Sequence, residues 1–174
     1  MFTLETERLG LRPLTLDDAP ALHELIDKHE DMWWFDPGYA RSYEERVQYV
    51  QRRLEQYEHL GFGCFAIETK EDGNLVGQGG LSPYEFEGCD GIKSEVFEVM
   101  YAIGLVYQGQ GYATEAAAAW VDYAFNVARL PRLVVCPNKA NVASVRVLEK
   151  LGFHIKDDWQ EPGSIVATLE CKAE

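Results

Sequence analysis

We expect the chain to fold as one α/β domain that spans residues 1–174, and three observations predict this fold class. The chain has 174 residues, of which 47% are hydrophobic and 26% are charged, a balance that supplies one sizeable core. Its apolar residues recur at helical spacing in some segments and at every second position in others. No internal repeat, linker or low-complexity stretch divides the sequence.

The first third of the sequence predicts a strand followed by two helices. Residues 9–14 form a short apolar run that is typical of a strand. Asp17 or Asp18 then caps a helix whose apolar side chains lie on one face. Ser42 and Glu45 have the spacing of a capping box, which predicts a second helix that runs to about residue 59.

The middle of the sequence changes to a period of two, which predicts strands. Residues 64–69 and 74–81 flank Asp72-Gly73, a dipeptide that favours a hairpin turn. We expect a polar insert over residues 83–94 and a third strand over residues 96–105.

The last third of the sequence predicts two helices and three strands. An alanine-rich helix covers about residues 112–128, and a short buried strand covers residues 133–136. The second helix covers about residues 141–152, where a glycine suits the position just after a helix. Residues 153–157 and 164–170 are then expected to form the two terminal strands.

Charge and cysteine usage limit the partners that we expect. The 29 acidic and 16 basic residues give a formal net charge of -13, so nucleic acid is not an expected partner. The same charge either attracts a cationic substrate or only keeps the surface soluble. The four cysteines and four histidines show no ligand spacing, so we expect no metal. No signal peptide or membrane span is visible, and we expect a cytoplasmic protein without membrane contact.

A glycine-containing turn separates the third predicted strand from the alanine-rich helix. Gly109 and Gly111 let backbone amides point at one spot, and the start of the helix adds partial positive charge. Such a turn can cradle a pyrophosphate, although a tight strand-to-helix connection also favours glycine. The turn is neither a Walker loop nor the glycine fingerprint of a dinucleotide fold.

A second motif lies about thirty residues further on. Asn141 and Ser144 are three residues apart, so both project from one side of the first turn of a helix. By itself this spacing also fits an ordinary Asn cap followed by an unremarkable first-turn Ser.

Together the two motifs resemble those of the N-acetyltransferases of the GNAT superfamily. Gln108, Gly111 and Ala113 match the Q/R-x-x-G-x-G/A signature, and Asn141 and Ser144 match an N-x-x-A/S motif that is followed by Leu-Gly-Phe. The stretches over residues 6–12 and 111–116 look like the RimJ/RimL-like branch, which contains the ribosomal-protein N-terminal acetyltransferases. The resemblance implies a mixed, mostly antiparallel central sheet flanked by about four helices.

The resemblance also implies a reaction and a donor. An acetyl group would pass from acetyl-CoA to a primary amine, either a protein N-terminus or a small-molecule amine, by direct attack on the thioester. A homodimer is possible. The residues that the resemblance assigns to coenzyme binding are Ile103, Gln108, Gly109, Gln110, Gly111, Tyr112, Ala113, Thr114, Asn141 and Ser144.

The catalytic groups are less well marked. Many relatives have, at the position of Leu148, a tyrosine that donates a proton to the departing thiolate. In this chain the nearest hydroxyl that could replace it is that of Ser144, which would alternatively only position coenzyme A. Glu98 is the candidate base, although a glutamate at this position also fits an ordinary surface residue. Strand alternation places Glu98 and Met100 on one face and Val99 and Tyr101 on the other, and a bulge would shift that assignment.

The resemblance implies that the early helices and their loop build the acceptor pocket, and aromatic residues mark the candidate positions. They are expected to line a pocket, to form a dimer contact or to pack in the core. The candidates are Trp33, Trp34, Tyr84 and Tyr101. Two other functions stay open: a non-catalytic acyl-CoA-binding module, which the missing tyrosine favours, and a nucleotide-phosphate enzyme that uses the turn differently.

Overall fold

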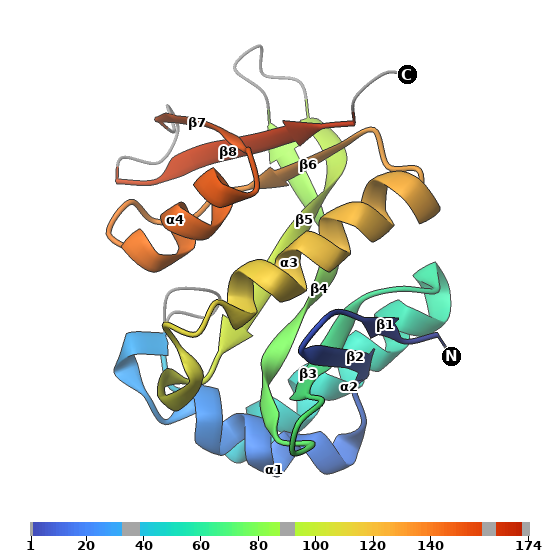
Figure 1. Ribbon diagram of the computed structural model, residues 1–174, viewed down its shortest axis with the longest axis vertical. Coiled ribbons are helices and arrows are strands. Elements are labelled where there is room, and N and C mark those ends of the chain that lie inside the picture. Colours follow the sequence, from blue (N-terminus) through green and yellow to red (C-terminus); the bar gives the residue numbers. More distant parts are fainter. Residues whose placement is uncertain (1, 33–38, 88–92, 158–162, 172–174) are drawn as a thin grey trace.

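The computed structural model describes residues 2–32, 39–87, 93–157 and 163–171. Its centre is one eight-stranded sheet with the strand order β1-β2-β3-β4-β5-β6-β8-β7. The pairing of β5 with β6 is parallel, and the other pairings are antiparallel. Helices cover both faces of this sheet (Figure 1). The prediction of a mixed, mostly antiparallel sheet with about four helices is therefore confirmed.

After β1, which the sequence did not predict, the helices and strands follow the expected order along the chain. The strands are β1 (Leu4–Glu5), β2 (Leu9–Pro13), β3 (Cys64–Thr69), β4 (Leu75–Glu87), β5 (Lys93–Ile103), β6 (Arg132–Val135), β7 (His154–Asp157) and β8 (Ile165–Glu170). The helices are α1 (Ala19–Leu22), α2 (Tyr43–Leu60), α3 (Tyr112–Asp122) and α4 (Val142–Lys150). α1 continues into a π-helical turn over His23–Asp27, and α3 into one over Tyr123–Val127.

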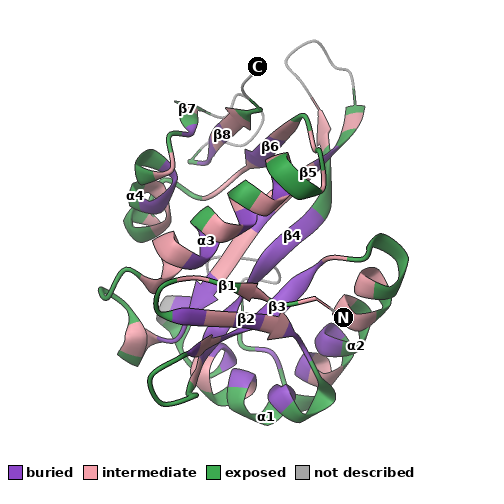
Figure 2. Cartoon of the chain, turned by 45° about the vertical axis from the view of Figure 1, so that its right-hand side comes forward, coloured by how far each residue is buried: buried purple, intermediate pink, exposed green. Residues whose placement is uncertain are grey.

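Two hydrophobic clusters lie on the two faces of the sheet. The first joins α3 and α4 to the sheet through fully buried side chains such as Trp120 and Leu148. The second joins α1 and α2 to the opposite face through Leu22 and Val50. Side chains alternate between the clusters along each strand, because successive Cβ atoms point to opposite faces. Buried residues accordingly concentrate in the middle strands and on the inward sides of the helices (Figure 2).

Side-chain caps fix the start of two helices. The amide of Glu45 donates to Ser42 Oγ at 3.2 Å, and the amide of Ser42 donates to Glu45 Oε2 at 2.7 Å, which confirms the capping box. The first helical segment instead begins at Thr15, whose amide donates to Asp18 at 2.7 Å. Asp18, one of the two expected caps, is the N-cap residue of α1, but its carboxylate makes no cap hydrogen bond to that helix and instead reaches back to Thr15.

The expected polar insert over residues 83–94 was also wrong. β4 and β5 pair continuously from Gly77 opposite Ile103 to Glu87 opposite Lys93, without a register shift. The far end of this hairpin extends beyond the hydrophobic clusters, and Lys93 there forms a 2.8 Å ion pair with Glu85. In the β4 part of this extension Tyr84 and Phe86 alternate with Glu85 and Glu87, so a strand pattern is present, but it is short and follows Pro83. None of the helices in the described part of the chain is long and apolar enough to cross a membrane.

Candidate active site

The glycine-containing turn presents unpaired backbone amides at the start of α3. Gly109 and Gly111 have φ angles of 76° and 85°, which favour glycine. Gly111 is the N-cap residue and has no side chain to accept a hydrogen bond from the first turn. The Gly111 carbonyl accepts from the amide of Glu115 at 3.0 Å, and the amides of residues 112–114 precede that first helical bond. We name residues 108–114 the cradle; it is suited to an anion.

The N-terminal segment holds one rim of the cradle. Arg8 forms an ion pair with Glu115 at 2.6 Å, and its Nη1 donates to the carbonyl of Gln110 at 2.9 Å. Its guanidinium also lies 4.7 Å from the centre of the Tyr112 ring. Burial opposes ionisation of Glu115, but hydrogen bonds from Thr6 and Arg8 outweigh it and hold its pKa below the usual value. Sequence reasoning did not assign Arg8 to the site.

The strand edge beside the cradle is open along part of β5. β5 and β6 are joined at one residue pair, Phe97 and Leu133. From Glu98 to Ile103, β5 keeps β4 on one edge, and among the described residues no strand pairs with the other. The carbonyl of Ile103 accepts from the side-chain amide of Gln108 at 3.0 Å. Such an edge can accept an extended ligand by strand-like hydrogen bonding.

α4 approaches this open edge through its first turn. Asn141 Oδ1 accepts from the amide of Ser144 at 3.1 Å, so Asn141 caps the helix as its type predicts. The hydroxyl of Tyr101, on β5, lies 3.0 Å from Ser144 Oγ and 3.3 Å from the Ser144 carbonyl oxygen. Leu148, where many relatives have a tyrosine, is fully buried in the core. It brings no proton donor to this edge.

The opposite face of β5 carries the candidate base. Glu98 and Met100 lie toward α2, and Val99 and Tyr101 toward α3, as alternation predicts for a strand without a bulge. Glu98 is paired in register with Ser82 of β4, whose hydroxyl accepts from Arg53 Nη1 at 3.0 Å. Burial raises the pKa of the Glu98 carboxyl, and the charge of Arg53 opposes part of that rise.

Comparison with known proteins shows the family to which the chain belongs. The family model "Acetyltransferase (GNAT) domain" matches residues 8–154. The chain belongs to the GNAT acetyltransferase family. The chain is 30% identical over 172 residues to the uncharacterized protein YkkB of Bacillus subtilis (strain 168). This match covers 98% of the chain and 95% of YkkB. The chain is also 29% identical over 149 residues to the spermidine N(1)-acetyltransferase of Escherichia coli (strain K12). This match covers 85% of the chain and 74% of that relative.

The fold agrees with that assignment. The solved structure of RimL, a ribosomal L7/L12 α-N-protein acetyltransferase in complex with coenzyme A, has a TM-score of 0.76 to this chain. The sequence identity is 21%, and the match covers 99% of this chain and 100% of RimL. The expectation of a GNAT N-acetyltransferase with a RimJ/RimL-like fold is therefore confirmed, and the chain is an acyltransferase of this family.

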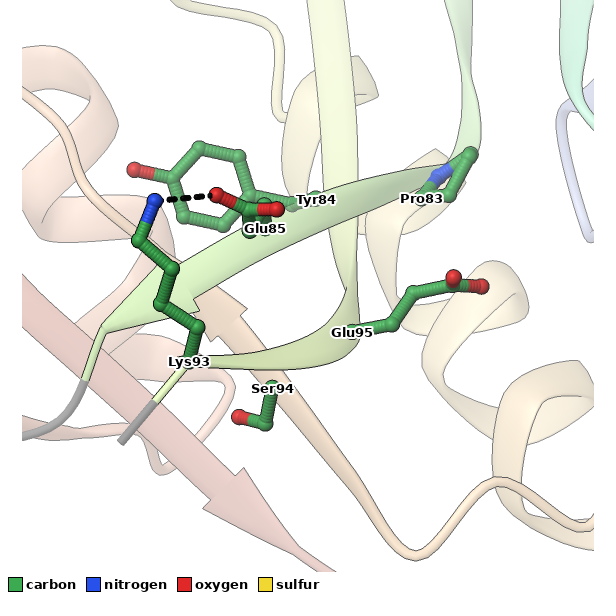
Figure 3. Close-up of a pocket in the computed structure, with 6 residues that line it drawn as sticks. All are labelled: Pro83, Tyr84, Glu85, Lys93, Ser94 and Glu95. Carbon is green, nitrogen blue, oxygen red and sulfur yellow. Dashed lines mark hydrogen bonds and ion pairs between the residues drawn. The ribbon is translucent and has the colours of Figure 1, made fainter.

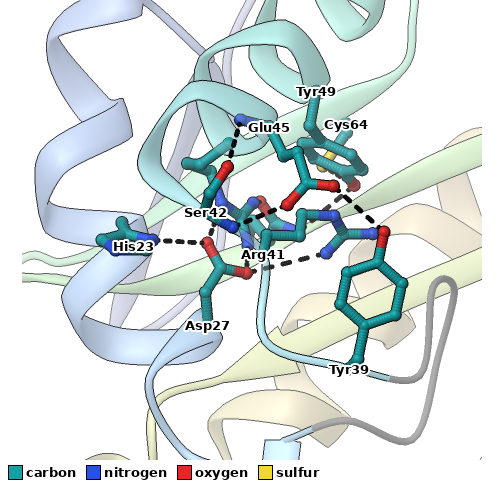
Figure 4. A network of polar contacts seen from close by, with 10 residues as sticks. His23, Asp27, Tyr39, Arg41, Ser42, Glu45, Tyr49 and Cys64 are labelled. Atoms are coloured by element: carbon teal, nitrogen blue, oxygen red, sulfur yellow. Dashed lines mark hydrogen bonds and ion pairs between the residues drawn. The ribbon is translucent and has the colours of Figure 1, made fainter.

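A buried polar network anchors the α1–α2 side of the acetyltransferase (Figure 4). Asp27 accepts from Arg46 Nε at 2.6 Å, and Arg41 lies 3.7 Å from the same carboxylate. Arg46 also donates to Gln78 of β4 at 3.0 Å. The guanidinium groups of Arg41, Arg46 and Arg53 all lie within 4.9 Å of the centre of the Tyr49 ring. The network therefore fixes α2, and with it Arg53, against the strand that carries Ser82.

The aromatic candidates of the acceptor site are spread out. Tyr84 lines a shallow hollow of about 230 Å³ at the outer part of the β4–β5 hairpin, together with Lys93 and Glu95 (Figure 3). This hollow lies toward the hairpin end and away from the cradle. Tyr101 lies on the α3–α4 face of β5, where its hydroxyl contacts Ser144. Trp33 and Trp34 fall outside the described residues.

In the described part of the chain, no group of three or more His, Cys, Asp or Glu is arranged to hold a metal ion.

Proposed function

We propose that this acetyltransferase binds acetyl-CoA along the open edge of β5 and passes the acetyl group directly to a primary amine. One observation carries the proposal: the cradle, with its unpaired helix-start amides, lies at the end of the strand edge that has no described neighbour between Glu98 and Ile103. The cradle suits a pyrophosphate, and the strand edge suits an extended arm with amide groups. The side-chain amide of Gln108 holds the Ile103 carbonyl that such an arm would otherwise use.

The two faces of β5 divide the chemistry. We assign the coenzyme to the face of β5 that carries Tyr101, which contacts Ser144 of α4, and the attacking amine to the face that carries Glu98. A raised pKa brings a carboxylate closer to neutral pH, where it is a more effective base for an ammonium group. The charge of Arg53 opposes part of the rise in the pKa of Glu98. Direct attack then gains most of its rate from holding the amine and thioester together.

The proposal leaves two classes of amine as candidates to accept the acetyl group. The relative from Escherichia coli is named for spermidine, and RimL is named for a ribosomal protein. Both a small-molecule amine and a protein N-terminus are therefore candidates. The experiment measures release of free thiol from acetyl-CoA with a pool of amines and, separately, with ribosomal N-terminal peptides.

The proposal predicts thiol release in at least one pool, and loss of that release in Glu98→Gln. A melting shift with coenzyme A shows independently whether the donor binds. Binding without release in either pool would favour the acyl-CoA-binding module and contradict the proposal. Stabilisation by ATP but not by coenzyme A would favour a nucleotide-phosphate enzyme.

A further inference from the structure

A pair of hydroxyl groups joins β5 to α4 at the open strand edge. Tyr101 lies on β5, four residues after Phe97, where the pairing of this strand with β6 ends. Its side chain is half-buried against the α3–α4 cluster, and its hydroxyl lies 3.0 Å from Ser144 Oγ. The Ser144 amide is occupied by the Asn141 cap, so the orientation of this serine is fixed from its backbone side.

The reaction leaves a thiolate that needs a proton on this face. Leu148 cannot supply it, and a lone serine hydroxyl is a poor acid. On the same face of β5, the neighbouring residues Val99 and Ile103 are aliphatic, so Tyr101 is the residue of this strand stretch that carries an acidic proton. Burial raises the pKa of Tyr101 to about 12, while the hydrogen bond to Ser144 works in the opposite direction. The phenol is therefore fully protonated at neutral pH.

We propose that Tyr101 and Ser144 form a relay that delivers a proton to the sulfur of coenzyme A as the acetyl group leaves. The proposal rests on the proposed acetyl-transfer function. Ser144, at the helix start, is the group that meets the sulfur, and Tyr101 acts through it. A hydroxyl group can donate one hydrogen bond while it accepts another, which is what a relay through Ser144 requires.

The proton and electron movements balance. The amine nitrogen bonds to the thioester carbon, the carbon–sulfur bond breaks, and its electron pair goes to sulfur. The Ser144 hydroxyl gives its proton to sulfur and takes one from the Tyr101 phenol. The tyrosinate recovers a proton from solvent, and the proton lost by the amine leaves through Glu98. Because a phenol is a weaker acid than a thiol, complete transfer to sulfur depends on the return of a proton from solvent to the tyrosinate.

The test compares Tyr101→Phe with a matched variant, Tyr123→Phe. Both remove one phenol hydroxyl from a half-buried tyrosine that packs on the α3–α4 cluster, but Tyr123 stacks on Phe2, away from the cradle. We expect Tyr101→Phe to lower kcat by about 100-fold, within the usual range for a lost proton donor. The KM for acetyl-CoA should change by less than roughly threefold, because the lost interaction forms with the leaving group. Tyr123→Phe should keep the wild-type kcat.

Variants of Ser144 separate a relay from simple packing. Ser144→Ala should lower kcat as much as Tyr101→Phe, and the double variant should be no slower than either single variant, because both break one relay. Ser144→Thr keeps the hydroxyl and should restore most of the rate. This comparison also decides the matter if Tyr101→Phe does not fold, since Ser144→Thr would then have to exceed Ser144→Ala.

Three results would overturn the relay: a wild-type kcat in Tyr101→Phe, an increase in KM alone, or losses that multiply in the double variant. Ser144→Thr as slow as Ser144→Ala would also overturn it. These outcomes leave the proposed function intact as long as the wild-type chain turns over acetyl-CoA. If the wild-type chain binds coenzyme A and transfers nothing, the proposed function fails, and the relay fails with it.

Discussion

Gly111 gives a sharp test of the cradle, because its backbone conformation excludes other residues. Its φ of 85° lies in the left-handed region, and a Cβ there would meet Arg8 Nη2 at 3.3 Å. Gly111→Ala therefore introduces strain of about 1–2 kcal/mol, the usual cost of a left-handed conformation for an L-residue. Arg8 adds little, since the contacting atom is the end of a flexible side chain.

The strain of Gly111→Ala divides between folding and binding. If the turn keeps its conformation, the free energy of unfolding falls by the whole amount. If the exposed turn relaxes, binding must restore its shape, and the affinity for coenzyme A falls instead. Since residues 108–111 are all exposed, we expect relaxation and a Kd for coenzyme A that rises about 5- to 30-fold. Isothermal titration measures the Kd, and denaturant unfolding measures the part of the strain that lowers the free energy of unfolding.

Gly73→Ala is the matched control. Gly73 has a φ of 69°, and no atom lies within 4 Å of a Cβ built there. Gly73 lies in the β3–β4 hairpin turn. The substitution Gly73→Ala therefore introduces similar backbone strain away from the cradle. We expect it to lower the free energy of unfolding and to leave the Kd unchanged. The reasoning is refuted if both variants weaken coenzyme binding alike, or if Gly111→Ala changes neither quantity.

Three further predictions, with Lys28→Ala as a control, concern the face of the sheet toward α1 and α2. Glu98→Gln should lower kcat by at least about 100-fold and abolish the acidic limb of the pH–rate profile, provided that Glu98 is the base. Arg53→Met removes the charge that opposes the raised pKa of Glu98, so the acidic limb should move to higher pH; a shift to lower pH, or none, would contradict the assignment. Arg46→Met leaves the buried Asp27 carboxylate without its closest cationic partner and should cost about 3–5 kcal/mol in denaturant unfolding. Lys28→Ala removes one partner of an exposed pair and should cost below about 1 kcal/mol.

Local patterns predicted much of the fold. The Ser42–Glu45 capping box and the Asp72-Gly73 turn depend on neighbouring residues, and the structure confirms both. The faces of Glu98 and Tyr101 follow from simple alternation along β5. The extension of β4 and β5 beyond the core was missed because the alternation of Tyr84 and Phe86 with glutamates is short and follows Pro83, a residue that disfavours a strand.

The candidate site was predictable where its residues are close in sequence. The cradle and the first turn of α4 each lie within a few residues, so their motifs are visible in the sequence. Arg8, Arg53 and the Tyr101–Ser144 contact join residues that are distant in the chain. Such contacts follow from strand order and helix packing, which no local spacing encodes. The opening stretch over residues 6–12 was the one available sign that Arg8 belongs near the cradle.

Transfer of a labelled acetyl group tests the central claim most directly. The chain is incubated with acetyl-CoA that carries ¹³C in the acetyl group, together with the amine and peptide pools, and the products are identified by mass spectrometry. We predict a labelled amide that forms in step with free coenzyme A, and that is lost in Glu98→Gln while that variant still binds coenzyme A. Tight binding of coenzyme A by the wild-type chain without any labelled amide would contradict the claim.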